Sequence, residues 1–293
     1  MTSLYQGNKI ENIFEADWLE YEYLVALDAL ASLESMARVL DKKKNNKRVH
    51  NTRIAFRRWY SVWSILARDL WQTEKFEVGL GKRVRACYKT LGKVRDWDVN
   101  YKLAKSLTLS ESIVRRWAKK RSAVRAAAFK QLRKLALRDL VIDLRKYVVK
   151  RHKKLAEGRD KASEPAFTHI ERFLSIHEKE TAKLAAKASN IEGLHAMRLS
   201  IKAWRYILVE FFGLSSIKLV QAQQLLGKIV DLERMKGYLT LMESGKSVSK
   251  NEIVRAMEIV SKEEEKLISE LDSLKAALPY GFRPGHVSQA AQN

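Results

Sequence analysis

The sequence predicts an all-α protein with an internal duplication, on three observations. Its 293 residues include only 12 glycines and 3 prolines, and no proline precedes residue 165, so long helices are possible over most of the chain. Apolar residues recur at helical spacing almost throughout, and the alternating β-branched runs typical of strands are missing. The pattern His-x-x-Arg-x-x-x-Arg/Lys-x-Trp occurs twice, at residues 50–59 and 195–204.

The chain begins with three segments of different character. Residues 1–14 are predicted to be flexible, because they show little periodicity. An acidic helix is expected over about 17–40, with a heptad-like apolar stripe that can pack on other helices. The basic run at 42–48 is interpreted as a solvated turn, with a flexible arm that reaches for anions as the alternative.

The helix expected over 49–66 has two chemically opposite faces when it is drawn at 100° per residue. One face carries cations and no carboxylate, and includes His50, Arg53 and Arg57, with Arg58 at its margin. The other is apolar and includes Ala55, Phe56, Trp59, Val62, Trp63 and Leu66. Such a helix offers a dry face to a core and a row of donors to an anion.

A helix is expected next over about 78–107, containing the stretch LGKVRDWDV at 91–99. Gly92 costs a helix about 1 kcal/mol relative to alanine, so we expect a reason such as the close approach of another backbone. Lys89, Lys93 and Asp96 share a face, with Arg95 at its edge. The carboxylates of Asp96 and Asp98 are interpreted as helix caps or ion-pair braces, while the cations extend the row begun by His50.

A long helical region over 113–155 carries cations around much of its circumference, so at least half of them should be solvated. Arg121 and Arg125, one turn apart, are the weaker candidates for ligand contact. Residues 157–165 contain Gly158, Ser163 and Pro165 and are predicted to link the two halves, about 15–156 and 166–278.

The second half is expected to hold helices at about 166–189, 194–212, 216–243 and 250–277, with Gly213 as a helix stop and an unstructured tail at 281–293. Its basic helix places His195, Arg198 and Lys202 at an offset of 145 from their counterparts in the first half. The stretch LLGKIVD repeats the earlier glycine motif at an offset of 135, through Gly227, Lys228 and Asp231. Two motifs repeated in the same order indicate a duplication.

Charge and cysteine content limit the functional class. The net charge is +22, and residues 42–156 alone hold 34 basic and 8 acidic side chains. Such a segment repels itself unless counterions or a polyanion neutralise it. The single cysteine, Cys87, excludes an internal disulfide, and neither a signal peptide nor an apolar run long enough to span a bilayer is evident. We expect a cytoplasmic protein.

The motifs VHxxRxxxRR at 49–58, LGxxRDxDV at 91–99, LHxxRxxxKxxRYxxxE at 194–210 and LGxxxD at 226–231 resemble those of the CHAD domain, the conserved histidine α-helical domain, over about 15–280. The resemblance implies two similar antiparallel helical-bundle halves, related by pseudo-twofold symmetry around a basic cavity that binds inorganic polyphosphate. It also implies association with polyphosphate granules as a candidate location. The contacts that it implies are His50, Arg53, Arg57, Arg58, Lys93, Arg95, His195, Arg198, Lys202 and Arg205; Lys89, Lys228, Arg121 and Arg125 are further candidates from their spacing.

The residues support the same ligand independently, because a phosphate chain has charge at every unit and no apolar surface. Arginine grips phosphate oxygens in pairs and lysine supplies a compact charge. Nucleic acid, RNA or DNA, is the alternative ligand, since single-strand binders add aromatic rings on which bases stack. Trp59, Trp63 and Trp204 lie opposite the cations and are predicted to be core residues, whereas Tyr206 and Trp97 keep this alternative open.

Metal binding and catalysis are disfavoured by the sequence. His50 and His195 each lie one turn from an arginine, which would oppose a divalent cation, and no metal-ligand spacing is present. No phosphate-binding GxxxxGK[ST] motif occurs. Glu20 and Glu22 lack the following lysine of the CYTH triphosphatase domain, which is often fused to CHAD domains. We therefore expect a stand-alone binding protein without catalytic residues, metal or cofactor.

Overall fold

The computed structural model describes residues 18–42, 45–66, 76–157, 166–188, 190–242 and 248–277, and these ranges contain helices and no strand. The prediction of an all-α protein is confirmed. The helices are α2 (Trp18–Lys42), α3 (Asn46–Leu66), the π-helical turn η2 (Glu77–Gly81), α5 (Lys82–Ser106), α6 (Glu111–Lys134), α7 (Leu137–Glu157), α8 (Ala166–Lys187), α9 (Ile191–Phe212), α10 (Ile217–Thr240) and α11 (Lys250–Ala277). The predicted flexible start, the tail and all of the linker except Glu157 lie outside the described residues.

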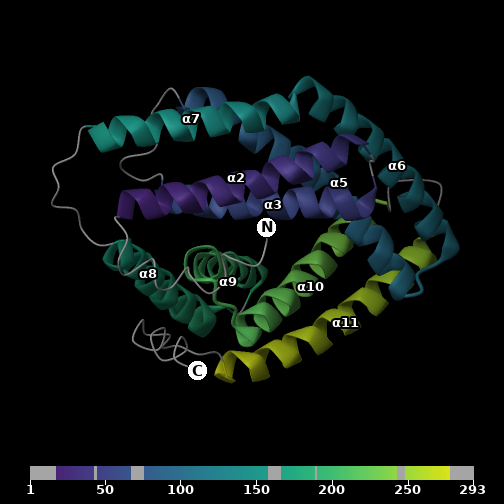
Figure 1. Ribbon diagram of the computed structural model, residues 1–293. Coiled ribbons are helices and arrows are strands. Elements are labelled where there is room, and N and C mark those ends of the chain that lie inside the picture. Colours follow the sequence, from purple (N-terminus) through teal and green to yellow (C-terminus); the bar gives the residue numbers. More distant parts are fainter. Residues whose placement is uncertain are drawn as a thin grey trace.

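Helices that are neighbours in the sequence pack on one another within each part of the chain, and the contacts follow the same order in both parts. In the first part α2 packs on α3, α3 on α5 and α5 on α6; in the second α8 packs on α9, α9 on α10 and α10 on α11. The two parts meet where α3 packs on α9, and also where α2 packs on α8 and α5 on α10. In Figure 1, α9 is viewed nearly along its axis while α3 runs across the view. This order agrees with the predicted duplication, and the pseudo-twofold relation itself stays a prediction.

The helices α3 and α9 turn their apolar faces into one hydrophobic core. Phe56 and Trp59 of α3 are at most 1% exposed, as are Trp204 and Phe211 of α9. Trp63 stacks on Trp59 with ring centroids 5.1 Å apart. The prediction that these tryptophans are core residues is confirmed, and the polar face of each helix is consequently fixed on the opposite side.

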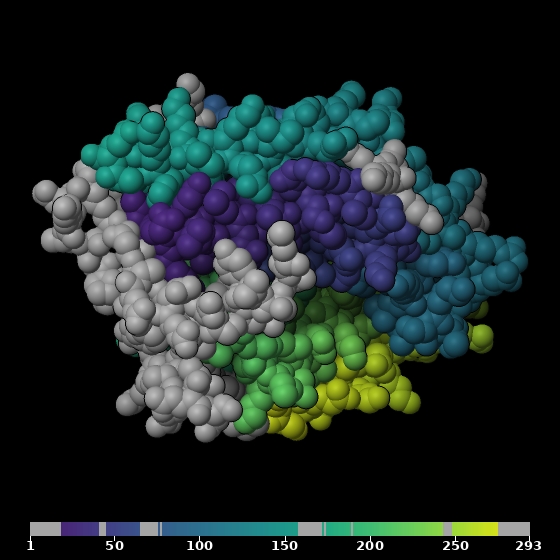
Figure 2. Space-filling model, viewed as in Figure 1, coloured from purple at the N-terminus to yellow at the C-terminus, as the bar shows by residue number. Residues whose placement is uncertain are grey.

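The region expected to be helical over 113–155 divides into α6 and α7 at a sharp corner. Ala136 has a φ of 47°, a left-handed conformation that ends α6. The division lets α7 fold back on α2 and bury an apolar stripe that includes Leu140, Leu144 and Val148. In Figure 2, α6 closes one end of the molecule beside α10 and α11.

Helix ends elsewhere follow ordinary capping chemistry. Gly213 stops α9 with a φ of 69°, as predicted, and its N–H and that of Leu214 donate back into the last turn. The side chain of Asn190 caps the start of α9 by accepting from the Gly193 N–H at 2.9 Å. None of the described helices is both long enough and apolar enough to cross a membrane.

Candidate anion-binding site

Cations from both parts of the chain converge where α3 packs on α9. The guanidinium of Arg57 donates to the hydroxyl of Tyr206 on α9 at 3.3 Å. Burial lowers the pKa of Arg198 and of Lys202, and the nearby charges of Arg57 and Arg53 lower both further. We call this group the basic cluster: His50, Arg53 and Arg57 of α3, Arg95 and Lys102 of α5, His195, Arg198, Lys202 and Arg205 of α9, and Arg234 of α10.

The two motif glycines make room for the two central arginines. A Cβ on Gly92 would lie 3.9 Å from Nε of Arg53, and a Cβ on Gly227 would lie 3.5 Å from Nε of Arg198. We expected another backbone near Gly92, and the structure instead places a guanidinium there. Each arginine therefore lies along the glycine face of the following helix, α5 in one case and α10 in the other.

Buried guanidinium nitrogens in the cluster have unused hydrogen-bonding capacity. The Nε atoms of Arg53, Arg57 and Arg198 are buried and have no hydrogen-bond acceptor among the described residues. Buried donors normally have partners, and leaving one without any is energetically costly. An anion with several oxygens, bound beside these arginines, would give the guanidiniums the acceptors that the described part of the chain does not supply.

Tyrosine rings hold the guanidiniums in position. Arg53 lies over the ring of Tyr88 at 5.3 Å from its centroid, and Arg205 lies over the ring of Tyr206 at 4.6 Å. Nε of Arg205 also donates to Gln223 on α10 at 2.8 Å. These contacts hold the guanidiniums in place before any ligand arrives.

The mutual repulsion of the cations is visible at Lys202. Burial, followed by the charges of Arg57, Arg198, Arg53 and Arg205, lowers the pKa of Lys202 from 10.5 to about 7. Burial and the surrounding arginines thus disfavour the charged form of Lys202, and a bound anion would favour it.

The two histidines respond to the same field. Burial is the largest cause that lowers the pKa of His50, and Arg95 is the largest charge that adds to it. The pKa of His195 is likewise lowered by burial and then by Arg198. Both histidines would accept a proton more readily beside a bound anion.

Two carboxylates enter the cluster, and both face Arg234. Nη1 of Arg234 donates to Asp96 at 2.9 Å and lies 3.7 Å from Asp231. Burial raises the pKa of Asp231, against the opposing effect of Arg234 and Arg198. The ion pair between Arg234 and Asp96 ties α5 to α10, which confirms the interpretation of Asp96 as an ion-pair brace. The two carboxylates leave most of the cluster's positive charge uncompensated.

Three predicted contact residues are held in ion pairs away from the centre of the cluster. Arg58 binds the buried carboxylate of Glu210 through Nε at 2.7 Å and Nη2 at 2.9 Å. Asp98, which is 1% exposed, accepts from Nε of Arg121 at 2.6 Å and from Nη2 of Arg125 at 3.1 Å. These arginines join helices to one another, and a role for them in ligand contact stays a prediction.

The remaining predicted residues are exposed lysines. Lys89 and Lys93 lie on α5 to either side of Gly92 in the sequence, and Lys228 directly follows Gly227 on α10. Their positions beside the two glycines suit an extended ligand that continues past the cluster. A contact with ligand stays a prediction for each of them.

Three members of the site were missed at the sequence level, although helical spacing could have found them. Lys102 follows Arg95 by seven residues, and Arg234 follows Gly227 by the same interval. Tyr88 precedes Gly92 by one turn. Over the described residues, no group of three or more His, Cys, Asp or Glu side chains is arranged to hold a metal ion.

A family model described as the CHAD domain matches residues 25–239. The fold is similar to the crystal structure of the CHAD domain from the plant Ricinus communis, with a TM-score of 0.70 and 19% identity over 90% of this chain and 93% of that chain. It is also similar to PptA from Streptomyces chartreusis, with a TM-score of 0.63 and 13% identity over 95% of this chain and 100% of the other. No curated protein matches the sequence. Because the family match spans well over half of the residues, the resemblance expected from the four motifs is confirmed, and the chain belongs to the CHAD domain family.

Proposed function

We propose that the basic cluster binds inorganic polyphosphate and does so without catalysing a reaction. The observation that carries this proposal is the convergence of buried, incompletely bonded arginines with Lys202, whose pKa is lowered to about 7 by burial and by the arginines around it. Membership of the CHAD family, which is linked to polyphosphate binding in general, supports the same conclusion.

A linear phosphate chain suits the chemistry of the cluster. It presents charged oxygens at every unit, so successive phosphates can meet successive cations on α3 and α9, and the guanidiniums can each grip two oxygens. It has no apolar surface, so it requires charged donors of the kind that the cluster brings together. Affinity then comes largely from the release of counterions and falls steeply with added salt.

Nucleic acid is the less favoured ligand because the tyrosines of the cluster are unsuitable for base stacking. Tyr206 is 4% exposed and lies beneath Arg205, and Tyr88 lies beneath Arg53. A base would have to displace the guanidinium to reach either ring. Single-strand binders instead present ring faces to the solvent along the backbone groove.

The proposal is tested by charge reversal at both central arginines. Arg53→Glu together with Arg198→Glu puts two carboxylates where the phosphates are proposed to lie. We expect retardation of long-chain polyphosphate to be lost in the double variant while circular dichroism shows unchanged helicity. Because both side chains are largely buried, Arg53→Gln with Arg198→Gln is a milder second pair, expected to weaken binding by at least roughly tenfold.

The matched control reverses two exposed lysines of α6, Lys130→Glu and Lys134→Glu, which changes the net charge equally. We expect this control to bind nearly as the unaltered protein does. A folded Arg53/Arg198 variant with unchanged affinity would remove these arginines from the site. Equal or tighter binding of random RNA at matched charge would favour nucleic acid, and release of orthophosphate on incubation with polyphosphate would contradict a non-catalytic role.

Polyphosphate granules in the cytoplasm are the cellular location that this proposal implies. A fluorescent fusion is expected to concentrate on granules, and the Arg53/Arg198 double variant is expected to remain dispersed.

A further inference from the structure

An aromatic pocket lies apart from the predicted contact residues, where α5, α6 and the end of α10 meet. Its volume is about 540 Å³, within the usual range for small-molecule sites. In Figure 2 this region belongs to the end of the molecule that α6 closes. The lining residues are Trp97, Arg116, Trp117, Lys119, Lys120, Ala123, Tyr238, Leu241 and Met242.

The inner wall of the pocket is a set of packed rings. Trp97 lies against Tyr238 with centroids 4.7 Å apart and meets Trp117 edge-on at 6.4 Å. Trp117 is 1% exposed, and its indole N–H donates to the sulfur of Met242 at 3.1 Å. Trp97 and Tyr238 are only partly buried. The buried indole thus fixes a wall of packed rings, in which Trp97 and Tyr238 lie against each other and both line the pocket.

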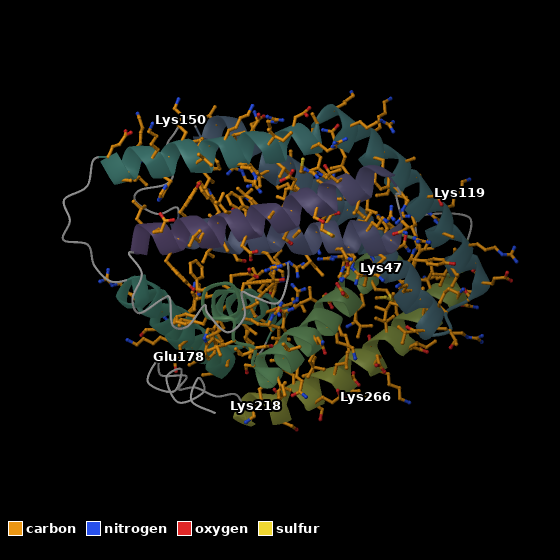
Figure 3. The ribbon with its side chains drawn as sticks, viewed as in Figure 1. Lys47, Lys119, Lys150, Glu178, Lys218 and Lys266 are labelled. Carbon is orange, nitrogen blue, oxygen red and sulfur yellow. The ribbon has the colours of Figure 1, made fainter. Side chains whose placement is uncertain are left out.

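The outer rim of the pocket is cationic. Arg116, Lys119 and Lys120 follow one another at helical spacing on α6, and Lys119 and Lys120 are exposed. Figure 3 labels Lys119 on α6 at that end of the molecule. None of the described residues that line the pocket is acidic. The lining therefore complements a ligand with a flat apolar part and a head of several negative charges.

The geometry points to a nucleotide site in this pocket, with the base against Trp97 and Tyr238 and the phosphates beside Lys119 and Lys120. Base stacking on aromatic side chains and charge-assisted bonds to phosphate are the two interactions that the lining offers. A single carboxylate would satisfy only part of the cationic rim, and bare polyphosphate would leave the ring wall uncovered.

The pocket adjoins the basic cluster without sharing its central residues. Burial raises the pKa of Tyr238, and the nearest charges acting on it are Asp96 and Arg234, the ion pair that ties α5 to α10. The ring wall therefore adjoins the cluster on the side of Arg234. The nucleotide site consequently depends on different cations from the site proposed for polyphosphate.

Calorimetric titration of the whole chain with ATP, adenosine and inorganic tripolyphosphate tests the inference. ATP is expected to bind and to quench tryptophan fluorescence, and adenosine is expected to bind at least roughly tenfold more weakly. The double variant Lys119→Gln with Lys120→Gln should bind ATP roughly tenfold more weakly, or weaker still. The matched pair Lys130→Gln and Lys134→Gln should leave the affinity for ATP nearly unchanged. The Arg53/Arg198 variants should lose tripolyphosphate binding and keep the quenching of tryptophan fluorescence by ATP.

A second pair of variants tests the pocket by filling it. Ala123 is exposed and lines the pocket, so Ala123→Leu should abolish ATP-induced quenching, while Ala126→Leu, also exposed on α6 but outside the lining, should preserve it. Three results would each overturn the inference: no fluorescence quenching by millimolar ATP, quenching that depends on Arg53 and Arg198 instead of Lys119 and Lys120, or binding of a fatty carboxylate such as laurate in place of ATP.

Discussion

Polyphosphate binding should take up a proton at Lys202, and the uptake should depend on pH. In the free protein the pKa of this lysine is about 7, because burial and four neighbouring arginines oppose its charge. A bound phosphate chain brings negative oxygens to the same place and raises the pKa back toward its ordinary value of 10.5. The protonated form is thus favoured by the ligand.

The expected magnitude follows from the two pKa values. At pH 8 about one tenth of Lys202 is protonated in the free protein and nearly all of it in the complex, so binding takes up roughly 0.9 proton. Affinity is fully present below pH 7 and falls as pH rises, by up to about tenfold for each pH unit above 7. At pH 6 the lysine is already charged and contributes only about 0.1 proton.

Calorimetry in two buffers with different ionisation enthalpies measures the uptake directly. Lys202→Arg is the matched variant, because its guanidinium stays charged over the whole range while a cation is kept at the same position. We expect the variant to bind at pH 8 without the extra proton. His50 and His195 have lowered pKa values, so they take up protons at more acid pH, and they do so in both proteins.

Equal proton uptake at pH 8 by the unaltered protein and by Lys202→Arg would refute this reasoning. Affinity that is constant between pH 6 and pH 9 would refute it as well, since the field of the arginines would then have no effect on Lys202.

Three further outcomes are expected. Gly92→Ala and Gly227→Ala should each raise the free energy of unfolding, measured by urea denaturation, by about 0.5–1 kcal/mol. The new methyl groups would only touch the arginines, at ordinary contact distances of 3.9 and 3.5 Å. A lower free energy of unfolding would mean that the space beside the glycines is tighter than described. Asp98→Asn should lower the free energy of unfolding by about 3 kcal/mol, because the carboxylate of Asp98 holds Arg121 and Arg125. Its affinity for polyphosphate should change little. A large loss of affinity would indicate that these arginines contact the ligand. Polyphosphate at 100 times its dissociation constant should stabilise the fold by about 2.7 kcal/mol in a thermal melt, and the Arg53/Arg198 double variant should show no such shift.

Helical periodicity predicted much of this fold because each basic helix has an apolar face on one side and a cationic face on the other. Trp59 and Arg57 fall on opposite faces of the expected helix, which predicted the buried side of α3. The repeated motif around Trp204 predicted the buried side of α9 in the same way. The corner at Ala136 was missed, because alanine is a strong helix former, and its left-handed conformation here accompanies the packing of α7 on α2.

Spacing along one helix predicted which cations share a face, but it could not predict which of them bind carboxylates of another helix. Arg58 and Arg57 are neighbours in the sequence, yet Arg58 is bound to Glu210, 152 residues away. For Gly92, spacing likewise predicted that another part of the chain comes close, but not which part. What approaches is the side chain of Arg53, and that depends on how α3 packs on α5.

The fit of each central arginine against a glycine suggests a criterion for reading other chains of this architecture. A valine or isoleucine at the position of Gly92 would add methyl groups beyond the Cβ, into the space that the guanidinium now fills, and would force the arginine to swing away. A domain with such a residue, on this reasoning, could keep its helices and its overall positive charge and still grip phosphate poorly. Two small residues, and not the total of basic ones, would then distinguish competent members from those that have lost the ligand.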